Sequence, residues 1–382
     1  MNKEEILGLH EKHIGVLGIA PQMAVKNRSD LSKAYTPGVA NLSKEIEQHP
    51  EMKKRLTLSG KLIAVVTDGS AVLGLGNIGP AGGLPVVEGK SLLYKDFSGV
   101  NALPLAVEQV TADEFVETIK NISKSFAGIH LEDIAAPKCF EIEEKLSKEI
   151  NIPVYHDDQE GTAIVVLAGL INAAKVADKP LTDLKVVVNG VGAAGLATAA
   201  LLKNAGINKI TLVDVKGVIR ADSADYNEYQ KKLAAEINYD VKGKKLENVI
   251  AGQDVFIGLS DANVLSAAQV KKMAAGAIIF ALANPVPEID PQVALDAGAE
   301  IVATGSSQYP NQVNNILVFP GLFKGLLHSG LKKVDFEVEK TVAKALAEMV
   351  ENPTKEKIIP GVFDPGVVDT VTQAITKSYQ KK

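Results

Sequence analysis

The chain has 382 residues, of which 46% are hydrophobic and 23% are charged, a length and balance typical of a globular protein with two or three domains. Its formal net charge of −5 argues against a nucleic-acid-binding protein, which would normally carry a basic stripe. A single cysteine, Cys139, excludes an internal disulfide and a thiol-rich metal site, and it is compatible with the reducing cytoplasm, where we expect the protein.

The N-terminal half begins with a charged segment and continues with short strands and helices. Charges stand where a signal peptide needs its apolar stretch, and the uncharged runs 69–87 and 301–323 are interrupted by Gly, Pro, Asn or Gln, so we expect no membrane span. The β-branched apolar run 61–68 predicts a buried strand. Residues 111–126 predict a helix with one apolar face behind a Thr-x-x-Glu capping box. Further strands are expected at 128–131 and 152–155.

From residue 160 onwards the pattern changes to a regular alternation of elements. A buried helix at 161–177 and a parallel-sheet strand at 184–190 are followed by further expected elements: 193–206 (helix), 209–214 (strand), 254–260 (strand), 267–276 (helix), 277–285 (strand), 291–298 (helix) and 300–305 (strand). Such alternation is typical of a doubly wound α/β domain. The last stretch, 334–349, predicts an amphipathic helix.

The pattern Gly-x-Gly-x-x-Gly occurs twice in the sequence. At 74–79 it is followed by further Gly and Pro residues, so we expect a loop there, with no helix starting in register and no helix N-terminus to bind a pyrophosphate. At 190–195 a predicted strand precedes the motif and a predicted helix follows it. This context predicts a dinucleotide site at Gly190, Gly192, Ala193, Ala194 and Gly195.

Asp214 ends the next predicted strand, 24 residues after Gly190. A carboxylate at this place would accept hydrogen bonds from the ribose hydroxyls and repel a 2′-phosphate, which favours NAD over NADP. Lys216 could offset part of that repulsion, so NADP remains possible.

Carboxylates follow two of the predicted strands. Glu132 and Asp133 close one of them, and His156, Asp157 and Asp158 close the other. Ligands bind at the carboxyl ends of parallel strands, and oxygen ligands select Mg²⁺ or Mn²⁺. Solvated loop carboxylates, with Asp157 or Asp158 capping the next helix, are the alternative. Several acids packed at buried strand ends without a cation would be costly, which favours a metal site.

Segments in order along nearly the whole chain resemble the malic enzymes, in their short bacterial form. They are Tyr35-Thr-Pro-Gly-Val-Ala, Thr67-Asp-Gly-Ser-Ala-Val-Leu-Gly-Leu-Gly, Gly83-Leu-Pro-Val, Glu88-Gly-Lys90, Glu132-Asp-Ile, His156-Asp-Asp-Gln-Glu-Gly-Thr, Ala283-Asn-Pro and Asn311-Gln-Val-Asn-Asn. The resemblance implies an N-terminal α/β malic-type domain at 1–157. It also implies a Rossmann-like NAD-binding domain with C-terminal helices at 158–382.

The resemblance also implies roles for individual residues. Lys90 would be the general base, Tyr35 the acid that protonates the enol, and Asp157 a support for Lys90 and the metal site. The expected metal ligands are Glu132, Asp133 and Asp158, and the residues expected to hold the substrate carboxylate and the nicotinamide ribose are Asn284, Asn314 and Asn315. Ala71 departs from the long-form enzymes, which carry a substrate-gripping arginine there. A lysine base must be neutral, so its pKa has to fall by several units from ~10.4, as a nearby metal ion would favour.

The expected activity is oxidative decarboxylation of malate to pyruvate and CO₂ by a homodimer that uses NAD, or NADP, with Mn²⁺ or Mg²⁺. An oxaloacetate decarboxylase of the same family, without net redox turnover, is the closest alternative. A metal-independent amino-acid dehydrogenase and a non-catalytic dinucleotide sensor are two further ones. The three carboxylates count against the dehydrogenase, and the intact catalytic set counts against the sensor.

Overall fold

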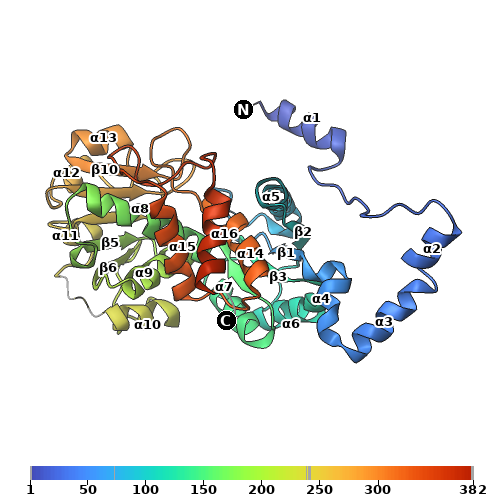
Figure 1. Cartoon of the computed structure of the whole chain (residues 1–382). Helices are drawn as coiled ribbons and strands as arrows, with labels where there is room; N and C mark the ends of the chain where they lie inside the picture. Colours follow the sequence, from blue (N-terminus) through green and yellow to red (C-terminus); the bar gives the residue numbers. More distant parts are fainter. Residues whose placement is uncertain (1, 73, 238, 240–241, 380–382) are drawn as a thin grey trace.

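A computed structural model describes residues 2–72, 74–237, 239 and 242–379, so residues 380–382 of the expected C-terminal domain lie outside the described range (Figure 1). The first sheet is fully parallel and has the strand order β2-β1-β3-β4. Its strands are β1 (Leu62–Thr67), β2 (Asn101–Ala106), β3 (Gly128–Glu132) and β4 (Val154–His156). The carboxyl ends of its strands therefore lie along the same edge.

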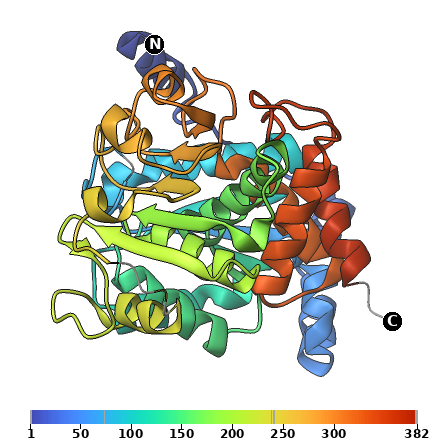
Figure 2. The same cartoon turned by 90° about the vertical axis from the view of Figure 1, so that its left-hand side faces the viewer.

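The second sheet has six strands in the order β10-β9-β8-β5-β6-β7, and only β7 runs antiparallel (Figure 2). Its strands are β5 (Lys185–Asn189), β6 (Lys209–Asp214), β7 (Gly217–Val218), β8 (Val255–Gly258), β9 (Ala277–Ala281) and β10 (Ala299–Thr304). The order reverses between β5 and β8, and this switch point is where doubly wound sheets bind dinucleotides. The prediction of an α/β protein with a doubly wound C-terminal part is confirmed.

Helices cover both sheets. Around the first sheet lie α5 (Gly79–Leu93), α6 (Ala112–Ile122) and α7 (Lys138–Glu149). Around the second lie α8 (Thr162–Val176), α9 (Ala193–Asn204), α10 (Glu228–Ile237), α11 (Leu246–Val249), α12 (Ala267–Val270) and α13 (Pro291–Asp296), and the chain ends with α14 (Phe319–Ser329), α15 (Phe336–Glu348) and α16 (Val367–Ser378). The predicted capping box is present at the start of α6, between Thr111 and Glu114. Within the described ranges, no helix is both long and apolar enough to cross a membrane.

Helix α5 shows that one prediction was wrong, because a helix does start at the end of the first Gly-x-Gly-x-x-Gly segment. Pro80 stands in its first turn, where the missing N–H of proline removes no intrahelical hydrogen bond. Gly83 lets the helix pass close to β1, since a Cβ atom there would lie 3.1 Å from Cγ2 of Thr67, the last residue of that strand. Lys90 consequently projects from the last turns of a helix packed on the sheet, rather than from a loop.

The start of α5 is nevertheless a poor place for a phosphate. The backbone N–H groups of Ile78 and Gly79 both donate to the carbonyl oxygen of Gly69, at 3.0 and 3.1 Å. A helix binds anions through N–H groups that have no partner within the chain. At the start of α5, two N–H groups already have a partner and are not available to a phosphate.

The C-terminal part of the chain returns to the first sheet through α14. Phe319 and Phe323 on this helix contact the ring of Tyr94, with centroids 4.9 and 5.7 Å apart. One continuous hydrophobic core runs from β1 through α8 to α14 and α16. The segment that joins the two sheets, the π-helical turn η5 (Asp157–Gly161), is thus held from both sides, and the expected domain boundary between residues 157 and 158 lies at its start.

Residues 17–52 form an extended arm that projects from the body of the molecule (Figure 1). The arm contains α2 (Arg28–Ala34) and α3 (Gly38–Gln48), while α1 (Lys3–His13) precedes it and α4 (Lys53–Leu56) follows it. Both ends of the arm are tied to the body, since the backbone N–H of Val16 donates to Glu88 and the ammonium of Lys53 donates to the carbonyl of Lys124. No residue of the described chain before Ser59 is buried.

Candidate active site

The ends of β3 and β4 bring the predicted metal ligands together. These strands pair in parallel with Leu131 opposite His156, so Glu132 and Asp157 follow at neighbouring positions. Asp133 adopts the left-handed conformation, with φ of 55°, which turns the chain sharply at the strand end. In an extended strand the side chains of residues 132 and 133 would point to opposite faces. This turn is why both carboxylates can converge on one point.

Glu132, Asp133 and Asp158 each offer a carboxylate oxygen, and these oxygens lie within 4.8 Å of one another. The backbone N–H of Asp133 donates to Oδ2 of Asp158 at 2.9 Å, which fixes the spacing of the two residues. Oδ2 of Asp133 is buried and has no hydrogen-bond partner among the described residues. A buried carboxylate oxygen without a partner is costly, and a hard dication would satisfy it.

Lys90 projects from α5 into this cluster. Its ammonium contacts the carboxylate of Asp157 and lies 3.3 Å from Oε1 of Glu132. The side chain is only 14% exposed, and the ring of Phe319 lies 4.8 Å from the ammonium. Asp157 is held in turn by the hydroxyl of Tyr155, which donates to its Oδ1 at 2.6 Å. The position of Lys90 is therefore set by two charges and one aromatic face.

The charges of the cluster do not balance, because a single ammonium faces four carboxylates. Burial and the neighbouring charges of Glu132 and Asp157 raise the pKa of Asp158 to about 8, and burial also raises the pKa values of Glu132 and Asp133. Burial alone would lower the pKa of Lys90, but the charges of Asp157 and Glu132 outweigh it and raise this pKa. The expected fall in the lysine pKa is thus absent from the protein without a cation. These residues fit a dication, whose positive charge would offset the same carboxylates.

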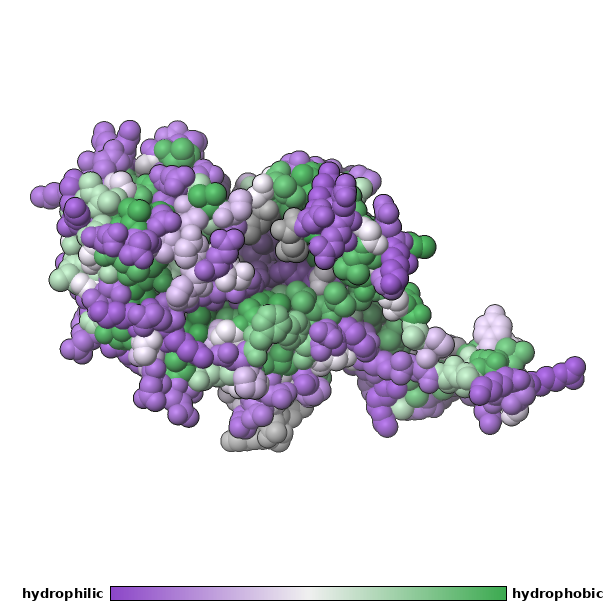
Figure 3. Space-filling view, turned by 90° about the horizontal axis from the view of Figure 1, so that it is seen from above, coloured by the Kyte–Doolittle hydropathy of each residue, from purple (hydrophilic) through white to green (hydrophobic). Residues whose placement is uncertain are grey.

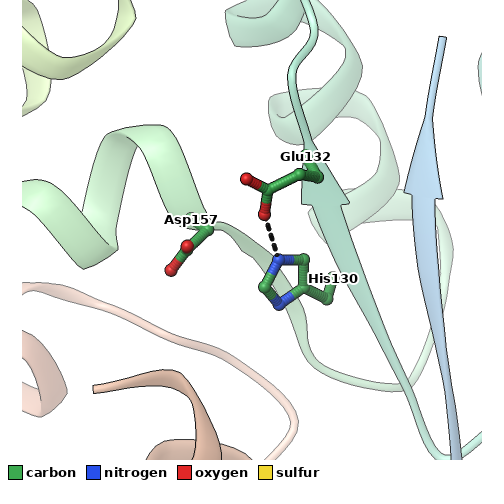
Figure 4. A group of neighbouring side chains, drawn as sticks. All are labelled: His130, Glu132 and Asp157. Atoms are coloured by element: carbon green, nitrogen blue, oxygen red, sulfur yellow. Dashed lines mark hydrogen bonds and ion pairs between the residues drawn. The ribbon is translucent and has the colours of Figure 1, made fainter. Parts of the chain in front are cut away.

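The sequence reasoning missed the residues that support this cluster from behind. His130 is fully buried, and its Nε2 lies 2.7 Å from Oε2 of Glu132 (Figure 4). Its Nδ1 lies 2.8 Å from the hydroxyl of Tyr94. The sequence does contain a sign of this contact. His130 and Glu132 are two positions apart in a predicted strand, which places both side chains on the same face.

The second Gly-x-Gly-x-x-Gly motif has the geometry of a dinucleotide site. Gly190 has φ of 94°, and a Cβ atom on Gly195 would lie 1.8 Å from the Gly190 carbonyl oxygen, so the tight turn and the close approach of α9 both require glycine. A Cβ atom on Gly192, the residue before α9, would meet nothing within 4 Å. The open space lies where the pyrophosphate would meet the helix N-terminus, at Ala193 and Ala194.

Asp214 lies at the end of β6, as predicted, and its side chain accepts only the backbone N–H of Lys216, at 3.3 Å, in the described part of the chain. The ammonium of Lys216 points elsewhere and donates to the carbonyl oxygen of Asp225 at 3.0 Å. It therefore does not neutralise the Asp214 carboxylate in this structure, which leaves the repulsion of a 2′-phosphate in place.

A cavity of about 200 Å³ joins the two halves of the predicted site. Its lining includes Asp158 from the carboxylate cluster, Ala194 from the glycine motif, and the predicted substrate residues Asn284, Asn314 and Asn315. Seen from above, the molecular surface is hollowed between its two halves (Figure 3). A ligand in this cavity would thus contact the cofactor motif and the carboxylates together.

Tyr35 is the one predicted catalytic residue that the structure does not bring to the cluster. It follows directly after α2 on the arm, is 66% exposed, and its side chain makes no hydrogen bond or ring contact with other described residues. Within a single chain, the expected acid is therefore absent from the site that contains the expected base.

Comparisons with known proteins agree with this arrangement. Residues 17–147 match the family model of the malic enzyme N-terminal domain, and residues 159–378 match that of the malic enzyme NAD binding domain. The chain is 47% identical to an NAD-dependent malic enzyme of Geobacillus stearothermophilus over 94% of this chain and 75% of that one. It is 46% identical to the bifunctional malic/malolactic enzyme of Bacillus subtilis, over 98% and 92% of the two chains.

Solved structures are similar over the whole fold. A malic enzyme from Pyrococcus horikoshii has a TM-score of 0.95 and 41% identity, covering 99% of this chain and 90% of that one. An NAD-dependent malic enzyme from Thermotoga maritima has a TM-score of 0.93 and 44% identity, covering 97% and 98%.

The raised pKa values of the carboxylates predict how a cation stabilises the protein. Because Asp158 has a pKa of about 8 instead of 3.8 and the pKa of Asp133 is also raised, the folded protein binds more protons than the unfolded chain between these values. Its stability without metal therefore falls as the pH rises. We expect saturating Mg²⁺ to raise the Tm more at pH 8 than at about pH 5, where protons compete with it. Calorimetry at both pH values checks this, with Asp133→Asn as the control that loses the difference. An equal shift at both pH values would contradict it.

Proposed function

This chain belongs to the malic enzyme family, and we propose that it oxidises malate and releases CO₂, forming pyruvate with reduction of NAD or NADP. The observation that carries the proposal is the position of Lys90. It lies between Asp157 and Glu132, at the edge of three carboxylates that fit a dication. One of these carboxylates, Asp158, lines the same cavity as the dinucleotide motif.

Lys90 is the group that takes the proton of the substrate hydroxyl in this proposal. Asp157 and Glu132 hold its ammonium in place, and Tyr155 keeps the Asp157 carboxylate from rotating. Asn284, Asn314 and Asn315 line the adjoining cavity with amides, which can hold a carboxylate and the nicotinamide ribose.

Glu132, Asp133 and Asp158 are the proposed ligands of Mg²⁺ or Mn²⁺. When bound, the cation would supply positive charge that lowers the pKa of Lys90 and stabilises the negative charge formed as CO₂ leaves, while the dinucleotide would accept the hydride. The Asp214 carboxylate, which the ammonium of Lys216 does not approach, supports our proposal that NAD is preferred to NADP.

We also propose that the active form is a homodimer in which the arm of each chain completes the site of the other. The arm exposes large apolar side chains, namely Ile19, Met23, Val25, Leu31, Tyr35 and Leu42. Apolar surface on a projecting segment without buried residues marks a protein contact. An exchange of arms about a two-fold axis would cover this surface and supply Tyr35, the proton donor for the enol, to the partner's Lys90.

The direct test of the reaction is reduced-cofactor formation from L-malate with Mn²⁺ and NAD, beside a parallel assay of oxaloacetate loss without cofactor. We expect metal-dependent NADH formation by the wild type. In Lys90→Ala, kcat/KM for malate should fall by about 10²–10⁴-fold because the base is lost, while NAD affinity stays the same. Lys179→Ala is the matched control, since Lys179 forms a similar, largely buried ion pair with Asp254 elsewhere in the fold, at 2.6 Å. No malate oxidation together with rapid oxaloacetate loss would instead assign the chain to the decarboxylases.

The cofactor preference is tested by Asp214→Ala. This variant removes the carboxylate that hydrogen-bonds the ribose and repels a 2′-phosphate, so the ratio of kcat/KM for NAD to that for NADP should fall by about tenfold or more. Steady-state kinetics with both dinucleotides measure the ratio. An unchanged ratio would remove Asp214 from the ribose site.

The exchange of arms is tested by co-expressing two variants, Tyr35→Phe and Lys90→Ala, each of which should be inactive when expressed alone. A site made of Tyr35 from one chain and Lys90 from the other is intact once in each mixed dimer. Random pairing should therefore restore about a quarter of the wild-type activity. If both residues acted within one chain, each site would lack one of them and the mixture would stay inactive. Each variant expressed alone is the control.

A further inference from the structure

His130 is enclosed by aromatic rings that come from three separate parts of the chain. Its ring centroid lies 5.4 Å from that of Tyr155 on β4, 5.7 Å from that of Tyr94 in the π-helical turn η3 (Tyr94–Ser98), and 5.7 Å from that of Phe319 on α14. The side chain is fully buried. Packing alone therefore fixes the plane of the imidazole.

Hydrogen bonds fix which nitrogen of this ring carries the proton. A neutral imidazole, the form that full burial among aromatic rings favours, has one donor and one acceptor nitrogen. An ionised Glu132, the form that binds a cation, can only accept, so Nε2 must be the donor across the 2.7 Å contact to Oε2. Nδ1 is then the acceptor for the hydroxyl of Tyr94, at 2.8 Å. Tyr94 thus donates a hydrogen bond to His130, and His130 donates one to Glu132.

These hydrogen bonds give the two oxygens of the Glu132 carboxylate different neighbours. Oε2 contacts His130, as the dashed line in Figure 4 shows, and Oε1 lies 3.3 Å from the ammonium of Lys90. A carboxylate held in this way presents Oε1 to a cation, because binding through both oxygens would make Oε2 share its lone pairs between the cation and the imidazole. Mg²⁺ and Mn²⁺ suit such single-oxygen ligands, whereas Ca²⁺ takes more oxygens and often binds a carboxylate through both.

We propose that His130, oriented by Tyr94, is a positioning residue that limits Glu132 to one metal-binding oxygen and thereby favours Mg²⁺ and Mn²⁺ over Ca²⁺. This inference rests on the cation site proposed above and assigns to that site its selectivity. His130 itself binds no metal in this account, since both of its ring nitrogens are engaged in hydrogen bonds.

The test measures binding of Mn²⁺ and Ca²⁺ to purified wild type and variants without substrate, by electron paramagnetic resonance of free Mn²⁺ and by Ca²⁺ competition. We expect His130→Ala to raise the Kd for Mn²⁺ by about 10–100-fold, the usual effect of losing a partner of a metal ligand. Affinity for Ca²⁺ should fall much less or rise, so that the preference for Mn²⁺ drops by about tenfold or more. His130→Gln, whose amide can donate to the same oxygen, should restore most of the preference.

Phe323→Leu is the matched control for packing. The ring of Phe323 stacks on that of His130, with centroids 6.4 Å apart, but it has no polar atom that could hold the Glu132 carboxylate. It should leave the preference for Mn²⁺ unchanged even where the Tm falls. An unchanged preference in His130→Ala would overturn the proposal, and so would a bound-Mn²⁺ resonance showing direct coupling to nitrogen of isotope-labelled histidine at position 130. A wild type that binds no Mn²⁺ would instead reject the cation site itself, so the two failures are distinguishable.

Discussion

Burying one ammonium with four carboxylates costs solvation free energy that the attraction between Lys90 and its two contacts only partly offsets. Burial, together with the remaining negative charge, raises the pKa values of Glu132, Asp133 and Asp158. One oxygen of Asp133 also has no hydrogen-bond partner among the described residues. The cluster therefore fits an additional cation. In the function that we propose, such a cation would also connect the metal site to the base, because the charge that neutralises the carboxylates would lower the pKa of Lys90.

The fold serves this cluster by bringing distant segments to one strand edge. Parallel pairing of β3 with β4 aligns the carboxylates, α5 carries Lys90 across the sheet, and α14 returns from the C-terminal part to cover the lysine with Phe319. The turn η5 holds Asp157 and Asp158 and leads directly into α8, which packs against α9 behind the glycine motif. A shift of the second sheet would therefore move the metal ligands together with the cofactor site. This coupling suits a reaction in which hydride transfer and decarboxylation use the same bound substrate.

Features that depend on local pattern could be predicted from the sequence. The parallel strands, the capping box of α6 and the dinucleotide motif at 190–195 all follow from spacing, and strand ends predicted the convergence of Glu132, Asp133 and Asp158. Strand β2 could not be predicted, because Pro104 interrupts its pattern and is tolerated only at the sheet edge where β2 lies. Helix α5 was missed because its glycines and prolines suit a loop until the contact with β1 is known. The position of His130 depends on Tyr94, 36 residues away, and the role that we propose for Tyr35 requires a second chain.

We propose that the carboxylates at the ends of β3 and β4 hold a dication beside Lys90. The most direct measurement is an anomalous difference map from a crystal grown with Mn²⁺, recorded at the manganese absorption edge. The account predicts one strong peak within ligand distance of Glu132, Asp133 and Asp158, at about 2.0–2.3 Å from each oxygen. A protein that oxidises malate in the presence of Mn²⁺ but shows its manganese peak elsewhere, or bound through the imidazole of His130, would contradict it.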